Sequence, residues 1–309
     1  MHVVVYGAGG IGGYFGARLV GGGTHVSFVA RGAHLEAIRS LGLRIESAAG
    51  DALVHPDAAS DDPGTLAPAD VVLLTVKLPD VAAAIEQLPS LVGPQTVVLP
   101  LQNGIEVADL LAAKLGVAPV ALGVAFIGAT VAAPGVVRHV GELARLRFGA
   151  LQAAQAPMLR RFLEACHRAR IDAAMVDDIR RVAWEKFVFL VGLSGLTTLA
   201  RQPIGVVRSD PALRALLAEA MDEVAALARA SGIALPADFV ARQLAFVDTL
   251  PAGQKASMLY DLEAGRPLEL PWLSGAVVRL AAAHGLATPV NRIVAAALGP
   301  WTAGAPTPP

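Results

Sequence analysis

Six residues near the start of the chain have the types and spacing of a phosphate-binding turn. They are Gly7-Ala8-Gly9-Gly10-Ile11-Gly12, which fit the pattern G-x-G-x-x-G between an apolar strand pattern and a helical pattern. The first glycine allows a tight turn, the second lets a pyrophosphate approach the backbone, and the third lets helix and strand pack closely. The N–H groups at the start of the helix would bind that pyrophosphate. The sequence therefore predicts a dinucleotide site, and the alternative is a glycine-rich turn in an ordinary α/β protein.

Arg31 indicates which dinucleotide is bound, because it follows the second expected strand at residues 25–29. Folds that prefer NAD usually carry an acid at this place, which accepts hydrogen bonds from the ribose 2′-hydroxyl. An arginine can instead hold a 2′-phosphate through paired, charge-assisted hydrogen bonds. We therefore expect NADP(H) as the cofactor. The alternative is that Arg31 is a solvated loop charge.

Further polar residues could supply the rest of a reaction. Lys77 and Asn103 follow apolar strand patterns, Lys186 lies in an apolar helix, and Ser257 and Glu269 come late in the chain. A hydride delivered by a nicotinamide cofactor builds negative charge on the group that it reduces, which needs a donor of a proton or a hydrogen bond. Lys186 is the candidate general acid, because burial would lower its pKa toward the operating pH. Glu269 would oppose that shift, so the sequence leaves the direction of the net shift open.

Each of these residues also has a purely structural interpretation. Lys186 could extend to the surface, and Glu269 could be a solvated loop acid. Asn103 could form a turn with Gly104, while still facing the cofactor. Ser257 could cap the helix that begins there, a role that is compatible with binding a substrate carboxylate.

Strand and helix patterns alternate through about residue 115, which predicts an α/β fold with a parallel sheet and right-handed crossovers. Continuous apolar runs at residues 71–76 and 96–99 are typical of parallel strands covered on both faces. Later strands are expected to add antiparallel pieces to this sheet, at residues 120–127, 136–139 and 143–148.

From about Asp178 the pattern is helical only, so the fold class is a Rossmann-type dinucleotide-binding domain followed by an all-helical C-terminal domain. The expected divisions are residues 1–177, 178–300 and a flexible tail at 301–309. A ligand is expected at the carboxyl ends of the parallel strands, in the cleft between the domains. The helix at residues 211–231 is apolar enough to pair with a second subunit, which would make a homodimer, or with its own core.

Composition narrows the range of partners. The 309 residues carry a net charge of −1 with both signs scattered, which argues against nucleic acid. The single cysteine, Cys166, excludes an intrachain disulfide and fits a reducing compartment, and no Cys/His cluster has metal-ligand spacing.

The uncharged stretch 115–137 is broken by prolines and glycines, which favours two buried strands over a membrane helix. The chain starts directly with a strand pattern and shows no signal peptide, so we expect a cytoplasmic protein with no membrane partner.

Taken in order, the separated segments resemble the ketopantoate reductase (2-dehydropantoate 2-reductase) family from Gly7 to about Pro289. The matching segments are the glycine turn, Thr75-Val76-Lys77, Gln102-Asn103-Gly104, Trp184-Glu185-Lys186, Ser257–Asp261 and Arg266–Glu269. The resemblance implies NADPH-dependent reduction of a 2-oxo acid, 2-dehydropantoate, to pantoate in pantothenate biosynthesis. It implies that the glycine turn, Arg31, Lys77 and Asn103 bind the cofactor, that Lys186 and Glu269 are catalytic, and that Ser257 binds substrate.

The chain departs from this family on one helix face. The family usually has asparagines four and eight residues after the catalytic lysine, where this chain has Leu190 and Ser194. These spacings keep the side chains on the face of Lys186, so Leu190 and Ser194 are expected to line the substrate site with Asn103 and Glu269. A site that loses polar partners discriminates less well for substrate hydroxyls. A more hydrophobic 2-oxo acid is therefore an alternative substrate, and a non-catalytic NADPH-binding regulator is a further alternative.

Overall fold

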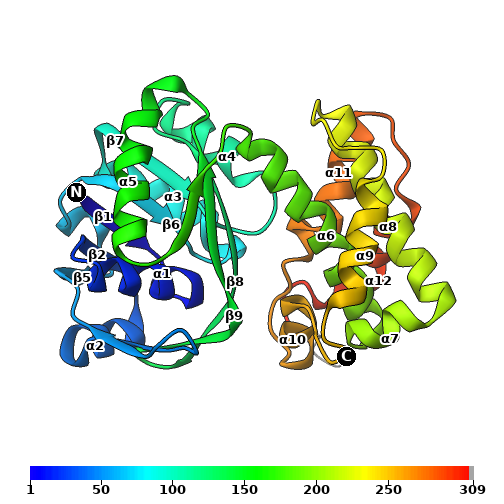
Figure 1. The fold of residues 1–309 in the computed structure, drawn as a ribbon, viewed down its shortest axis with the longest axis horizontal. Coiled ribbons are helices and arrows are strands. Elements are labelled where there is room, and N and C mark those ends of the chain that lie inside the picture. Colours follow the sequence, from blue (N-terminus) through cyan, green and yellow to red (C-terminus); the bar gives the residue numbers. More distant parts are fainter. Residues whose placement is uncertain (306–309) are drawn as a thin grey trace. The chain divides into compact units, whose positions relative to one another are not determined.

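The computed structural model describes residues 1–305, which divide into two compact units (Figure 1). Unit 1 contains residues 1–102 and 106–179. Unit 2 contains residues 103–105 and the chain from Arg180 onward. The short segment 103–105 thus belongs to the second unit although it lies far before it in the sequence.

The core of unit 1 is a parallel sheet of five strands in the order β5-β2-β1-β6-β7. Its central strands are valine-rich and buried on both faces, which is why they read as continuous apolar runs. The prediction of a Rossmann-type unit followed by a helical one is therefore confirmed. The strand bounds are β1 (His2–Tyr6), β2 (His25–Val29), β5 (Ala58–Ser60), β6 (Ala69–Leu74) and β7 (Val92–Pro100).

The helices of unit 1 bury their apolar side chains against this unit's sheets. Gly16 on α1 allows a close approach to β2, because a Cβ at this position would lie 2.5 Å from the ring of Phe28. Cys166 is fully buried, and burial raises the pKa of its thiol to about 12, so it remains a neutral core residue. The helices are α1 (Gly10–Gly21), α2 (Gly32–Leu41), α3 (Val81–Gln87), α4 (Val107–Leu115) and α5 (Ala156–Arg168).

The later strands form a second sheet instead of extending the first one, which corrects the sequence-based expectation. This sheet has the order β10-β9-β3-β4, and β8 pairs with β9 in antiparallel fashion. The runs 136–139 and 143–148 are one strand with a bulge between them, because Ile127 pairs with Ala144 but Gly128 pairs with Val140. The bounds are β3 (Leu43–Glu46), β4 (Ala52–Val54), β8 (Leu122–Ala133), β9 (Val136–Gly149) and β10 (Asp172–Met175).

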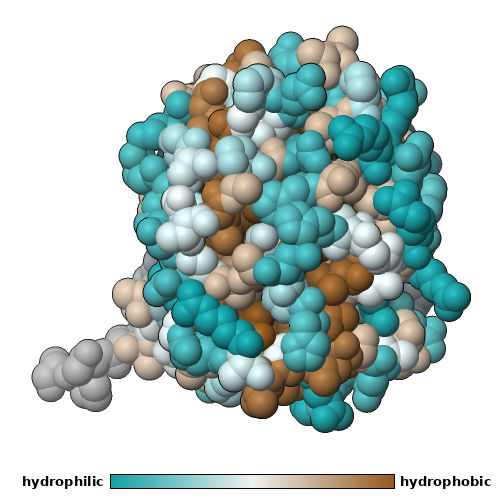
Figure 2. Space-filling model, turned by 90° about the vertical axis from the view of Figure 1, so that its left-hand side faces the viewer, coloured by the Kyte–Doolittle hydropathy of each residue, from teal (hydrophilic) through white to brown (hydrophobic). Residues whose placement is uncertain are grey.

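The uncharged stretch 115–137 therefore contains one long strand and the start of another. The end of β8 is mostly exposed, so the expectation of two buried strands is wrong for this part. Hydrogen bonding to β9 holds that end of the strand in place without burial. The space-filling view shows hydrophobic residues gathered in the lower part of one face (Figure 2), and the exposed apolar residues of unit 1 include Leu41 and Leu53.

Within the described residues, unit 2 contains helices and no strands. Its first helix, α6, is long and apolar enough to cross a membrane by length and composition, but 67% of its most apolar window is buried inside the protein. That burial is typical of a core helix. The helices are α6 (Ile179–Ala200), α7 (Ile204–Ser209), α8 (Pro211–Ala230), α9 (Phe239–Thr249), α10 (Ser257–Glu263), α11 (Ser274–Ala283) and α12 (Pro289–Leu298).

The apolar face of α8 is used by its own unit. Leu217, Met221 and Val224 are fully buried in the hydrophobic core of unit 2. Of the two interpretations of this helix, packing against its own core accounts for its apolar sequence.

Residues 301–305, the described part of the tail predicted to begin at Trp301, make contacts within unit 2. Trp301 is partly buried against the core of unit 2, and the Arg201 guanidinium lies 5.6 Å from its ring centroid. The backbone N–H of Ala305 donates to the Gly265 carbonyl at 3.0 Å. The bulky tryptophan ring holds this segment although the surrounding composition is rich in proline and glycine. Residues 306–309 lie outside the described part of the chain.

Helix α12 begins without a cap from its own segment, because the side chain of Thr288 makes no capping hydrogen bond. Glu223 on α8 instead accepts hydrogen bonds from the backbone N–H groups of Val290 and Asn291 at 2.7 and 3.0 Å. We expect Glu223→Ala to lower the free energy of unfolding by about 1–3 kcal/mol, since it leaves these N–H groups unpaired. Urea unfolding followed by circular dichroism measures this loss.

The matched control is Glu219→Ala, an exposed acid one turn earlier on the same helix. It should change the free energy of unfolding by less than about 0.5 kcal/mol. Equal losses in the two variants would contradict the capping role of Glu223.

Candidate functional site

The turn between β1 and α1 gives each of its glycines a different environment. Gly7 has a φ of +108°, which favours glycine, and a Cβ there would lie 2.8 Å from the backbone nitrogen of Val76. No atom lies within 4 Å of the place where a Cβ on Gly9 would be, so the backbone is open there. A Cβ on Gly12 would lie 2.2 Å from the Gly7 carbonyl oxygen, so helix and strand touch. This arrangement fits a pyrophosphate that approaches at Gly9.

The start of α1 is electrostatically suited to an anion. Gly9 is the N-cap residue, Gly10 and Ile11 are the first helical residues, and the first turn contains no acid. The partial positive charge of this helix end is therefore not cancelled locally. Ala8 is buried, with only 2% of its surface exposed.

His34 on α2 supports this turn, although the sequence analysis did not single it out. Its Nδ1 accepts a hydrogen bond from the Gly135 N–H at 3.0 Å, so in the neutral ring the proton is on Nε2. Nε2 lies 2.8 Å from the Ala8 carbonyl oxygen and donates to it. No local sequence signal marks this role, because His34 and Gly135 are brought together by the tertiary fold.

Polar residues that follow β6 and β7 hold the strand ends in place. The hydroxyl of Thr75 donates to the Gly7 carbonyl at 2.7 Å. The amide of Gln102 donates to the carbonyl oxygens of Leu74 and Val76, both at 3.0 Å. Lys77 is exposed and directly precedes a 3₁₀ turn, Leu78–Asp80. A polar residue directly after a buried apolar strand is the sequence signal common to these positions.

Arg31 follows β2 and is the N-cap residue of α2. Its side chain is 79% exposed, and one guanidinium nitrogen, Nη2, donates to Oδ1 of Asp80 at 2.8 Å. Since β2 and β6 flank β1 in a parallel sheet, the residues after these strands meet at one edge. Asp80 was not among the site residues predicted from the sequence, although an acid in the turn after a core strand is a signal that could have indicated it.

In unit 2 three of the predicted residues come together from distant parts of the chain. The ammonium group of Lys186, on α6, donates to Oδ1 of Asn103 at 2.9 Å. The amide nitrogen of Asn103 donates to Oε2 of Glu269 at 3.3 Å. Gly104 has a φ of +95°, and a Cβ there would lie 3.3 Å from the Trp272 carbonyl oxygen. This glycine therefore lets the Asn103 loop approach the turn that follows Glu269.

The surroundings of Lys186 determine the direction of its net pKa shift, which the sequence left open. Burial lowers the pKa of Lys186 to about 8, and the nearby negative charge of Glu269 opposes this shift without reversing it. At neutral pH such a lysine is largely protonated, yet it releases its proton more readily than an ordinary lysine. This is the property that a general acid needs.

The other predicted substrate residues are placed differently. Leu190 is partly buried and packs against the core of unit 2. Ser194 is fully buried, and its hydroxyl has no hydrogen-bond partner within the described residues, because α6 enters the core at this turn. Ser257 is exposed at the first position of α10, and Ala256 is the N-cap residue, so Ser257 does not cap this helix. In the described chain Ser194 and Ser257 form no hydrogen bond with the cluster of Lys186.

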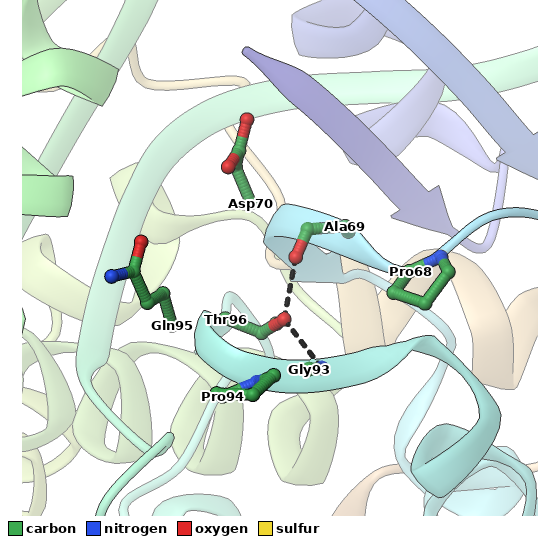
Figure 3. A pocket seen from close by; sticks show the side chains of 7 residues that line it. All are labelled: Pro68, Ala69, Asp70, Gly93, Pro94, Gln95 and Thr96. Carbon is green, nitrogen blue, oxygen red and sulfur yellow. Dashed lines mark hydrogen bonds between the residues drawn. The ribbon is translucent and has the colours of Figure 1, made fainter.

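A shallow pocket lies at the opposite edge of the parallel sheet (Figure 3). It is lined by residues at the starts of β6 and β7: Pro68, Ala69, Asp70, Gly93, Pro94, Gln95 and Thr96. The Thr96 hydroxyl accepts from the Gly93 N–H and donates to the Ala69 carbonyl, so these polar groups join the two strands.

Within residues 1–305, no group of three or more His, Cys, Asp or Glu side chains could hold a metal ion.

Comparison with known proteins gives matches along nearly the whole chain. The family described as "Ketopantoate reductase PanE/ApbA" matches residues 3–153, and its C-terminal counterpart matches residues 178–300. A 2-dehydropantoate 2-reductase from Halobacterium salinarum is 33% identical over 301 residues, which cover 96% of this chain and 97% of that protein.

Solved structures give the same result for the fold. A PanE/ApbA family ketopantoate reductase from Ralstonia eutropha JMP134 has a TM-score of 0.89 and 31% identity, with 98% of both chains covered. A D-mandelate dehydrogenase, solved with NADH and anilino(oxo)acetate, has a TM-score of 0.88 over 98% of both chains. At 20% identity this second likeness shows the fold alone.

The two family matches span both units in the same order, a dinucleotide-binding unit and then a helical unit. The relatives match along almost their full length as well. The chain therefore belongs to the ketopantoate reductase family and is an NAD(P)-dependent oxidoreductase that acts on CH–OH donors.

Proposed function

We propose that this enzyme uses NADPH to reduce a 2-oxo acid to a 2-hydroxy acid, with 2-dehydropantoate as the first candidate substrate. The observation that carries the proposal is the hydrogen-bonded cluster of Lys186, Asn103 and Glu269, in which the lysine has a lowered pKa. The relatives named 2-dehydropantoate 2-reductase support this substrate. We place the reaction in the cytoplasm and in pantothenate biosynthesis.

A nicotinamide cofactor held by unit 1 would supply the hydride for the carbonyl carbon of the substrate. Lys186 donates the proton that the carbonyl oxygen needs as it becomes an alkoxide, so ketone, hydride and proton together give the alcohol. Asn103 holds the lysine Nζ through its amide oxygen, which limits the directions in which that proton can be presented. Glu269 keeps the lysine protonated to a higher pH than burial alone would allow.

The residues of unit 1 fit a dinucleotide with a 2′-phosphate. The open backbone at Gly9 and the start of α1 would take the pyrophosphate, and the exposed guanidinium of Arg31 would take the 2′-phosphate. Lys77, in the turn after β6, would add positive charge at the same edge.

We expect Arg31→Ala to raise the Kd and KM of NADPH by about 10- to 100-fold, because hydrogen bonds to a charged phosphate are lost. The values for NADH should change by no more than about twofold, since NADH has no 2′-phosphate. Binding titrations and initial rates with both cofactors test this prediction. Arg39→Ala, on the same helix, is the control, and equal effects on the two cofactors would refute the phosphate assignment.

A more hydrophobic 2-oxo acid is the second candidate substrate. Leu190 lies one turn after Lys186 on α6, and if this face lines the substrate site, its apolar side chain would favour a substrate without a hydroxyl there.

The test is NADPH oxidation, followed by absorbance, against 2-dehydropantoate and a set of 2-oxo acids with branched or aromatic side chains. A kcat/KM that is highest for 2-dehydropantoate supports the first candidate, and a maximum at an apolar acid supports the second. Tight NADPH binding with no turnover of any acid would refute the proposed reaction and favour a regulator.

A further inference from the structure

The arginine that would hold a 2′-phosphate already has an anionic partner in its own unit. Nη2 of Arg31 donates to the Asp80 carboxylate at 2.8 Å, and the Asp80 side chain is 42% exposed. Asp80 is also the residue before α3, where an aspartate commonly caps the helix. Its side chain makes no such capping bond, so its hydrogen bond goes to Arg31 instead.

This pair changes the charge that an incoming cofactor would meet. A phosphate monoester carries about 1.5 to 2 negative charges at neutral pH, so a carboxylate beside its arginine repels it. Asp80 also occupies part of the donor edge with which a guanidinium forms its paired bonds to phosphate. A ribose 2′-hydroxyl, in contrast, can donate to a carboxylate, which is how acids select NAD in related folds.

We infer that Asp80 is a specificity-determining residue that weakens the preference for NADPH over NADH by competing with the 2′-phosphate for Arg31. The inference rests on the cofactor assignment made under the proposed function. It adds that the edge formed by β2, β1 and β6 carries both a phosphate-binding and a phosphate-repelling group. The protein therefore binds both cofactors, and its selectivity is lower than Arg31 alone would produce.

The test is Asp80→Asn, which keeps the shape of the side chain and removes its charge. Calorimetric titration without substrate measures Kd for NADPH, NADH, 2′,5′-ADP and 5′-ADP. We expect NADPH and 2′,5′-ADP to bind about five- to tenfold more tightly to the variant, because a like charge near the phosphate is removed. NADH and 5′-ADP should bind to the variant as well as to the unchanged protein or more weakly, since they lack the 2′-phosphate.

Asp172→Asn is the matched control, because Asp172 is likewise an exposed acid of unit 1 that pairs with an arginine, Arg145. It should leave all four dissociation constants unchanged. In the background of Arg31→Ala, the gain from Asp80→Asn should shrink, because the part that comes from competition for Arg31 is lost while the like-charge repulsion of the phosphate remains.

Weaker NADPH binding by Asp80→Asn would overturn the inference, since it would mean that Asp80 orients Arg31 for the phosphate. Unchanged binding would overturn it too. These results do not depend on turnover: an enzyme inactive on every 2-oxo acid would still give the four dissociation constants. Failure of the proposed reaction and failure of this inference are therefore separate outcomes.

Discussion

Replacing Lys186 by alanine should lower kcat by about 10²- to 10⁴-fold, the usual contribution of a positioned general acid. The variant loses the proton donor, and the amide oxygen of Asn103 loses its hydrogen-bond partner. The Kd of NADPH should stay within about twofold, because the elements that would bind its phosphates belong to unit 1. Initial rates at saturating substrate and a separate binding titration measure the two quantities.

Lys186→Arg separates charge from proton donation. Arginine keeps the positive charge, but its pKa is above 12, so it should not restore the lost rate. Lys114→Ala, an exposed lysine on α4 that pairs with Glu86, serves as the control and should retain full activity. An unchanged kcat in Lys186→Ala would rule out the assigned role.

Glu269→Gln should produce the second large effect on activity, and this effect is best seen in the dependence of kcat on pH. In the unchanged enzyme the pKa of Lys186 is about 8, so kcat should fall as the pH rises above that value and the protonated lysine is lost. Glu269 raises this pKa, so removing its charge lowers the pKa further. The alkaline limb should therefore move to lower pH, and activity at pH 8 should drop by about ten- to a hundredfold.

The profile of Glu269→Gln distinguishes electrostatics from simple structural damage. Structural damage would lower the rate at every pH and leave the midpoint of the limb where it was. Glu185→Gln is the control, because Glu185 adjoins Lys186 in sequence but pairs with Arg181. A midpoint that moves to higher pH in Glu269→Gln, or does not move, would contradict the role of this charge.

Much of the architecture was predictable because its signals are local. The glycine turn needs only neighbouring residues, because a φ of +108° at Gly7 is adopted readily by a residue that lacks a Cβ. The parallel strands were readable because burial on both faces leaves continuous apolar runs. The break at residues 140–142 was misleading, because Gly141 and its neighbours form a bulge inside β9 and not a turn between two strands.

Local patterns in the sequence were enough to predict the glycine turn, the parallel core of unit 1 and the helical character of unit 2, and the family resemblance indicated Lys186 and Glu269. Only the tertiary structure decided that Asn103 joins this lysine to this glutamate, since the three residues are far apart in the chain. It also decided the direction of the Lys186 pKa shift and the pairing of Arg31 with Asp80. The physical reason is that propensity and periodicity depend on near neighbours, whereas desolvation and ion pairing depend on which distant segments the fold brings within a few ångströms.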